Sequence, residues 1–216
     1  MEDSRFDDTL RLAGWLLAHQ VHALGKGGAP MPLICFFSED LEGPQLIAPK
    51  GGSGGFEDGG FEDHVSAGRA FLSYQSEEWA HWGFAYDEAL APSGRALLVE
   101  MGGQGFGDPL TLVQCYLPVA GRIPRFLGDF DLVGWEHLPA PRRQALQARN
   151  WRYLVTEGAT HHGEVGLDWL TWYAARDPEP AELRFEEVRR LVRSRKAAGE
   201  LREAGFPWKT LGATIR

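Results

Sequence analysis

Three segments with β character follow one another between residues 81 and 117 of this 216-residue chain, and their closeness limits the fold more than any other feature. In HWGFAYD (81–87), aromatic residues alternate with small or polar ones, which is the two-residue period of a strand with two different faces. RALLVEM (95–101) and LTLVQCYL (110–117) are apolar runs, and only a short turn and a glycine-rich loop separate the three segments. Because parallel neighbours would need a long crossover between them, the sequence predicts an antiparallel meander.

Helical periodicity begins on the N-terminal side of this meander. Apolar residues spaced three or four apart predict helices over 5–24 and 61–73, and short apolar runs predict strands over 32–37 and 44–48. The fold class is therefore α+β: an antiparallel sheet meander of about five or six strands packed by N-terminal helices, with a mostly helical C-terminal part. We expect both helices to cover an aromatic sheet face formed by Trp82, Phe84, Tyr86, Val99 and Met101.

The chain changes character at about residue 137. We divide it into an α+β sheet body, 1–136, and a helical C-terminal segment, 137–216, which we expect to pack on the same domain. The apolar pattern predicts helices over 140–150, 163–175 and 181–205. The run WRYLVT after residue 150 suits either a strand or a continuation of the preceding helix, and RIPRFLG and DLVGW are candidates for further short strands.

Charge is divided unevenly between the two parts of the chain. Residues 1–136 contain 8 lysines and arginines and 20 acids, which gives a charge of −12. Residues 137–216 contain 14 lysines and arginines and 10 acids, which gives +4, so the net charge of the chain is −8. Such an asymmetry suits either pairing between the two parts or two surfaces with different partners, and we favour the pairing.

Composition also limits the compartment. No apolar run approaches the roughly 20 residues that cross a bilayer, and the acidic N-terminus MEDSRFDD differs from a secretory signal. Cys35 and Cys115 lie in apolar runs typical of small buried residues rather than of a disulfide. We therefore expect a cytoplasmic protein with no membrane association.

An acidic, glycine-rich stretch at 51–64 (GGSGGFEDGGFEDH) is the first candidate for a binding site. Its second Phe-Glu-Asp unit opens the helix predicted from residue 61, where carboxylates favour the positive end of the helix dipole. A phosphate cradle needs a helix N-terminus that is not already occupied by negative charge, and a calcium loop needs alternating oxygen ligands, so neither is predicted. We interpret the stretch as an acidic binding loop whose charges come from Glu57, Asp58, Glu62 and Asp63.

Two groups of histidines are candidates for metal binding. His161 and His162, with Glu164, supply imidazole and carboxylate donors of the kind that zinc prefers. Adjacent histidines point in different directions on a regular element, however, so this site would need a special loop. His19 and His22 are spaced three apart on the first predicted helix, next to Trp15, and they have no nearby carboxylate in the sequence; we prefer surface or half-buried histidines there.

A carboxylate pair in the sheet is the candidate for catalysis. If residue 90 lies opposite residue 95, then Asp87 and Glu100 become diagonal neighbours on the face opposite the aromatic one. Two carboxylates at that spacing can share a proton or a metal ion. A register shift of one residue would separate them, and half-exposed acids on a solvated face are the simpler interpretation.

The basic run RRLVRSRK (189–196) is the candidate for nucleic-acid binding, through Arg189, Arg190 and Arg193. Glutamates flank this run at spacings that suit intrahelical ion pairs, which favours a salt-bridged, solvated helix face instead. No nucleophile motif was found, and the glycines at 102–107 lead into a strand rather than into the helix that a dinucleotide loop requires.

These observations lead to one main hypothesis and two alternatives. The main hypothesis is a non-enzymatic cytoplasmic interaction protein that uses its acidic surface to bind a protein with a basic surface, and it needs no cofactor. The first alternative is a metal-dependent hydrolase using the His161-His162-x-Glu164 loop, or the pair of Asp87 and Glu100. The second is nucleic-acid binding through the basic C-terminal helix.

Overall fold

The computed structural model describes residues 2–37, 45–49, 61–75, 79–90, 94–104, 109–119, 124–176 and 214–215. Two long helices and six strands make up the sheet body, and three short helices follow it. The helices are α1 (Glu2–Gly25), α2 (Phe61–Gln75), α3 (Ala140–Ala148), α4 (Trp151–Thr160) and α5 (Glu164–Ala174). The strands are β1 (Leu33–Phe37), β2 (Gln45–Ala48), β3 (His81–Leu90), β4 (Gly94–Gly102), β5 (Leu110–Leu117), β6 (Arg125–Val133) and the two-residue β7 (Thr214–Ile215).

The strands form one antiparallel sheet in the order β6-β5-β4-β3-β1-β2-β7. Strands β3 to β6 are sequential neighbours, so the predicted meander and the α+β fold class are confirmed. The two short strand candidates after residue 121 are a single strand, β6, whose pairing with β5 shifts register between Val113 and Cys115. Gly128 has a positive φ of 62° in this strand, a conformation that glycine adopts without steric strain.

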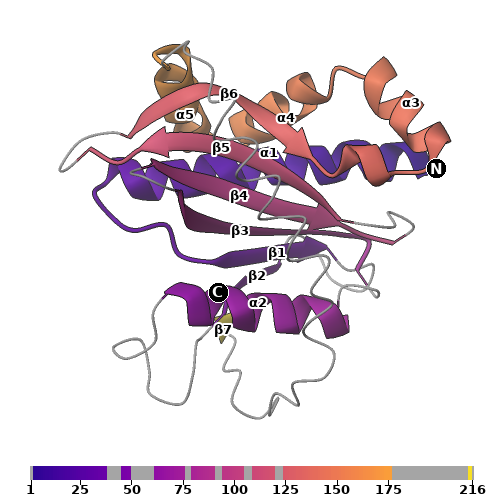
Figure 1. The fold of residues 1–216 in the computed structure, drawn as a ribbon, viewed down its shortest axis with the longest axis horizontal. Helices are drawn as coiled ribbons and strands as arrows, with labels where there is room; N and C mark the ends of the chain where they lie inside the picture. Colours follow the sequence, from indigo (N-terminus) through magenta and orange to yellow (C-terminus); the bar gives the residue numbers. More distant parts are fainter. Residues whose placement is uncertain are drawn as a thin grey trace.

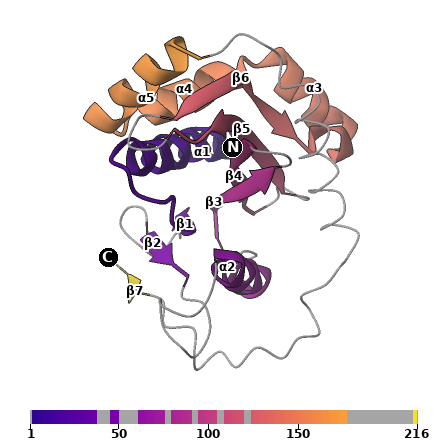
Figure 2. The same ribbon diagram turned by 60° about the vertical axis from the view of Figure 1, so that its left-hand side comes forward.

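Helices cover both faces of the sheet, as Figures 1 and 2 show. Helix α2 packs against one face, where Val65 and Leu72 meet the aromatic side chains of β3. Helix α1 packs against the other face, and α4 and α5 in turn pack on α1. The buried residues of α1, α4 and α5 belong to the same apolar cluster as the sheet face beneath α1, so the C-terminal helices share the core of the sheet body.

The predicted register of β3 and β4 was wrong by one residue. The structure pairs Leu90 with Gly94, and therefore Phe84 with Glu100. A shift of one residue moves every side chain of β4 to the opposite face. Val99 and Met101 consequently lie under α1, while Trp82, Phe84 and Tyr86 face α2 alone.

The segment WRYLVT belongs to a new helix rather than to a strand or to a continuation of α3. The backbone is extended at Arg149, and the Asn150 side chain then accepts a hydrogen bond from the Tyr153 amide at 3.2 Å, which caps the start of α4. The helix predicted at 181–205 lies outside the described residues. Among the helices that the structure does describe, none is long and apolar enough to cross a membrane.

Three arginines of the C-terminal segment pair with carboxylates of the sheet body. Arg149 lies 3.2 Å from Asp7, and Arg152 lies 3.9 Å from Asp131. Arg176 donates a hydrogen bond of 2.7 Å to Asp129. These contacts show that the uneven charge of the two parts serves, at least in the described residues, to join them.

Candidate functional site

A pocket of about 550 Å³ lies beside α1, on the sheet face that α1 covers. Its walls are mostly apolar, and α1, β3 and the end of α4 each contribute polar side chains. Helix α1 supplies four of the described lining residues at the spacing of a single helix face, β1 and β3 supply the sheet side, and the end of α4 closes the third side. The described residues that line it are Asp8, Arg11, Leu12, Trp15, Cys35, Phe37, Ala80, His81, Gly158 and His161.

Glycines set the positions of the elements around this pocket. A Cβ at Gly83 would lie 2.5 Å from a methyl group of Leu16, so glycine lets α1 lie close to β3 there. On the other side of α1, a Cβ at Gly14 would lie 1.8 Å from the Val155 carbonyl oxygen, and one at Gly158 would lie 1.9 Å from that of Arg11. The backbones of α1 and α4 therefore touch, and this contact brings the end of α4 to the pocket.

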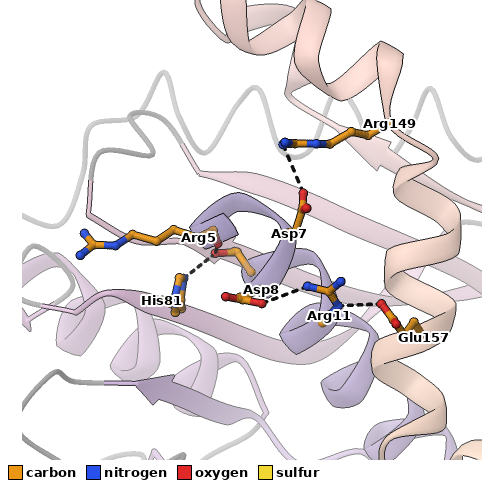
Figure 3. Close-up of polar contacts among 8 residues, drawn as sticks. Arg5, Asp7, Asp8, Arg11, His81, Arg149 and Glu157 are labelled. Atoms are coloured by element: carbon orange, nitrogen blue, oxygen red, sulfur yellow. Dashed lines mark hydrogen bonds and ion pairs between the residues drawn. The ribbon is translucent and has the colours of Figure 1, made fainter. Parts of the chain in front are cut away.

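An ionic network borders the pocket (Figure 3). Arg11 donates from Nε to Glu157 at 2.6 Å and from Nη1 to Asp8 at 3.0 Å, which ties α1 to α4. The hydrogen bond to Glu157 raises the pKa of Arg11, against an opposing effect of burial. Among the described lining residues, Arg11 is the one arginine, and two carboxylates hold its guanidinium, so these residues carry no excess positive charge.

His81 lies at the start of β3, with its ring held by α1 and β1. Its Nδ1 is 3.0 Å from the hydroxyl oxygen of the buried Thr9, and the Phe37 ring meets it edge-on at 6.3 Å. Burial lowers the pKa of His81; the Asp8 carboxylate opposes this shift and Arg5 adds to it. The imidazole is therefore neutral at pH 7.

The thiol of Cys35 belongs to the apolar wall. Cys35 is fully buried, and burial raises its pKa to about 12. A thiol that stays protonated at neutral pH is a poor nucleophile, so Cys35 serves the pocket by packing. Cys115 is also buried and outside any disulfide, as predicted, but it lies in the apolar cluster on the α2 face of the sheet.

A group of stacked rings lies next to the pocket, with Trp15 common to both. Trp15 stacks on His162 with ring centroids 4.2 Å apart, and His162 Nε2 lies 3.1 Å from His19 Nδ1. His22 follows one turn along α1 and lies 3.8 Å from Asp168 of α5. The sequence treated the two groups of histidines as separate candidates; the fold joins His19 to His162 because α4 ends beside α1.

The metal-loop prediction receives no support from this geometry. His161 lines the pocket whereas His162 stacks in the ring group, so the adjacent pair does not converge on one point. The side chain of Glu164 lies outside the described part. Within that part, no group of three or more histidine, cysteine, aspartate or glutamate side chains is placed to hold a metal ion.

The carboxylate pair was predicted wrongly, because of the register shift. Asp87 faces α1 and bonds Arg95 at 2.6 Å, while Glu100 faces α2 and accepts hydrogen bonds from Arg69 and Tyr86, both at 2.5 Å. The two carboxylates lie on opposite faces of the sheet and cannot share a proton. Each serves instead as the partner of an arginine.

The two charged candidates fall largely outside the described residues. This holds for Glu57, Asp58, Arg189, Arg190 and Arg193, and for the side chains of Glu62 and Asp63, whose backbone forms the start of α2 as predicted. The structure adds residues that the sequence analysis missed, above all Arg11, His81 and Glu157. For Arg11 the sequence signal was its helical spacing with Asp8 and Trp15 on α1, whereas His81 and Glu157 lie on other elements and had no such signal.

Comparisons of the chain with protein-family models, with curated proteins and with solved structures found no match.

Proposed function

We propose that this chain is a binding protein whose ligand is a small, mainly apolar molecule held in the pocket between α1, β1 and α4. The observation that carries the proposal is the pocket itself, whose volume of about 550 Å³ falls within the roughly 300–1,000 Å³ typical of ligand sites. Apolar walls with a few polar groups are also typical of such sites. They allow an apolar molecule to leave water while a polar group fixes its orientation.

The side chains around the pocket support binding rather than a reaction. The Cys35 thiol stays protonated, and Arg11 is engaged by Asp8 and Glu157. The Thr9 hydroxyl next to His81 donates to the carbonyl oxygen of Arg5 at 2.9 Å, so its hydrogen is committed to the backbone. Groups engaged in this way hold the shape of a site and orient what enters it.

The test uses titration calorimetry to measure the binding of 2-methoxynaphthalene, an uncharged apolar probe without a hydrogen-bond donor. We expect saturable binding at one site. Phe37→Ala removes a ring from the pocket wall and should weaken binding by about five- to tenfold, because less apolar surface of the probe is covered.

Phe71→Ala is the matched control, because Phe71 is also a partly buried phenylalanine but packs on the α2 face of the sheet. The Phe71→Ala protein should bind the probe with the same affinity as the unaltered protein. A protein that does not bind the probe, or equal weakening in both variants, would refute the proposal.

Our second prediction is that the acidic loop binds a partner protein with a basic surface. The favouring observation is that the carboxylates of Asp7, Asp129 and Asp131 already pair with arginines of the C-terminal segment, whereas the stretch 51–64 carries four acids and neither lysine nor arginine in its own sequence. Affinity purification at low salt, repeated with Glu57, Asp58, Glu62 and Asp63 changed to the corresponding amides, tests it. Capture that is independent of both salt and loop charge would exclude this role.

A further inference from the structure

One nitrogen of His81 is already engaged, and its partner identifies the tautomer. The Thr9 hydroxyl carries a single hydrogen, which it donates to the Arg5 carbonyl oxygen at 2.9 Å. The same hydroxyl oxygen lies 3.0 Å from His81 Nδ1, and at this contact it therefore accepts a hydrogen bond from the ring. His81 consequently carries its hydrogen on Nδ1 when neutral, and Nε2 keeps a free lone pair.

That lone pair belongs to a residue of the pocket wall. His81 is half-buried and lines the pocket, and within the described part of the chain no hydrogen bond to its Nε2 is formed. Burial keeps the ring neutral, as described above. His81 is half-buried rather than fully buried, so a ligand that covered Nε2 without offering a donor would take away its hydrogen bond to water and leave this cost uncompensated.

The charges around the pocket indicate an uncharged ligand. Arg11 lies between the carboxylates of Asp8 and Glu157 and offsets the charge of one of them. Arg5, which lowers the pKa of His81, offsets the charge of the other. The positive and negative charges near His81 therefore balance. Among the residues that the structure describes around His81, neither an anion nor a cation would find a free counter-charge.

We propose that the ligand is an uncharged molecule with an apolar body and one O–H or N–H group that donates a hydrogen bond to His81 Nε2. Leu12, Trp15 and Phe37 would contact the apolar body. This inference rests on the proposed function, since it names the chemical class of the molecule that the pocket takes.

The test compares 2-naphthol with 2-methoxynaphthalene, which have the same ring system and differ in that the methyl ether has no donor. At about pH 7.5 we expect 2-naphthol to bind about tenfold more tightly, because it alone can bond His81. In His81→Phe, this preference should disappear while 2-methoxynaphthalene still binds. His137→Phe, at an exposed histidine outside the pocket, should keep the preference.

The outcomes separate this inference from the proposed function. Equal affinities of the two probes in the unaltered protein would overturn the inference and leave the pocket as a binding site, whereas failure of both probes to bind would overturn the function as well. If His81→Phe does not fold, nitrogen NMR of the unaltered protein decides. The expected result is a hydrogen on Nδ1 of His81 and a shift of the Nε2 signal on addition of 2-naphthol; a hydrogen on Nε2 would refute the inference.

Discussion

His161 and His162 are neighbours in the chain, yet they belong to different parts of the molecule. His161 is exposed at the pocket, whereas the ring of His162 stacks with those of both Trp15 and His19. Burial lowers the pKa of both His19 and His162; the nearby His162 and His22 lower that of His19 further, and His22 also lowers that of His162. Asp168 faces His22 from α5 and is the carboxylate nearest to this group.

The lowered pKa values predict a loss of stability in mild acid. In the unfolded chain these histidines take up protons near pH 6.5, whereas in the folded chain they do so only at lower pH. Because the unfolded state then binds more protons, the free energy of unfolding should decrease as the pH falls below about 6.5. Urea unfolding at about pH 8 and about pH 5.5 measures this difference.

His162→Leu should reduce this pH dependence, because it removes one of the two buried rings. The control is His161→Leu, which alters the exposed neighbour and should keep the dependence of the unaltered protein. The same dependence in all three proteins would show that the ring stack does not titrate in this way.

At the scale of elements, the contact between α1 and α4 decides where the pocket closes. Gly14 and Gly158 face the backbone of the opposite helix, and neither site has room for a methyl group. Close-packed helices of this kind respond to added volume by moving apart, because the atoms in the way are carbonyl groups that cannot rotate aside.

Gly158→Ala should therefore lower the free energy of unfolding by about 2 kcal/mol or more, even though alanine is the better helix former. The displaced α4 should also weaken 2-methoxynaphthalene binding, since Gly158 lines the pocket. Denaturant unfolding and calorimetry measure the two effects. Tyr153→Ala, on the exposed side of α4, should change neither the free energy of unfolding nor that of binding by more than a few tenths of a kcal/mol. A stable Gly158→Ala protein with intact binding would mean that the helices do not touch as described.

At the scale of the whole molecule, one apolar cluster reaches from the sheet through α1 to α4 and α5. Trp169 of α5 is fully buried and lies 5.9 Å from the ring of Phe130 in β6. The ion pairs of Arg149, Arg152 and Arg176 cross between the same two parts of the chain. The sheet body and the helices up to residue 176 are thus joined both by apolar packing and by charge.

This common core predicts that residues 2–176 unfold in a single transition. Hydrogen exchange followed by mass spectrometry should give peptides from α5 and from β4 the same midpoint in a denaturant series, because neither can expose its core residues without the other. Earlier loss of protection in α5 would instead identify the C-terminal helices as a separate unit.

Local pattern was sufficient to predict most elements of this fold, although it left WRYLVT, now part of α4, open between a strand and a continued helix. Alternation in HWGFAYD and three- to four-residue spacing in the first 24 residues predicted β3 and α1, because each pattern reflects the geometry of its own element. The register between β3 and β4 was predicted wrongly by one residue, because a shift of one residue leaves the pattern within each strand unchanged. That shift separated Asp87 from Glu100 and assigned Val99 and Met101 to the wrong face.

By itself, the sequence determined the α+β class, the meander and the burial of both cysteines, because these follow from periodicity and apolar runs within short segments. Only the tertiary structure decided which distant residues meet. Arg11 and Glu157 are 146 residues apart, and His19 and His162 are 143 apart; each pair meets because two glycines let α4 touch α1. The pocket exists only where α1, β1, β3 and α4 meet, so no stretch of sequence contains its pattern, and its candidate ligand contacts became visible only in the folded chain.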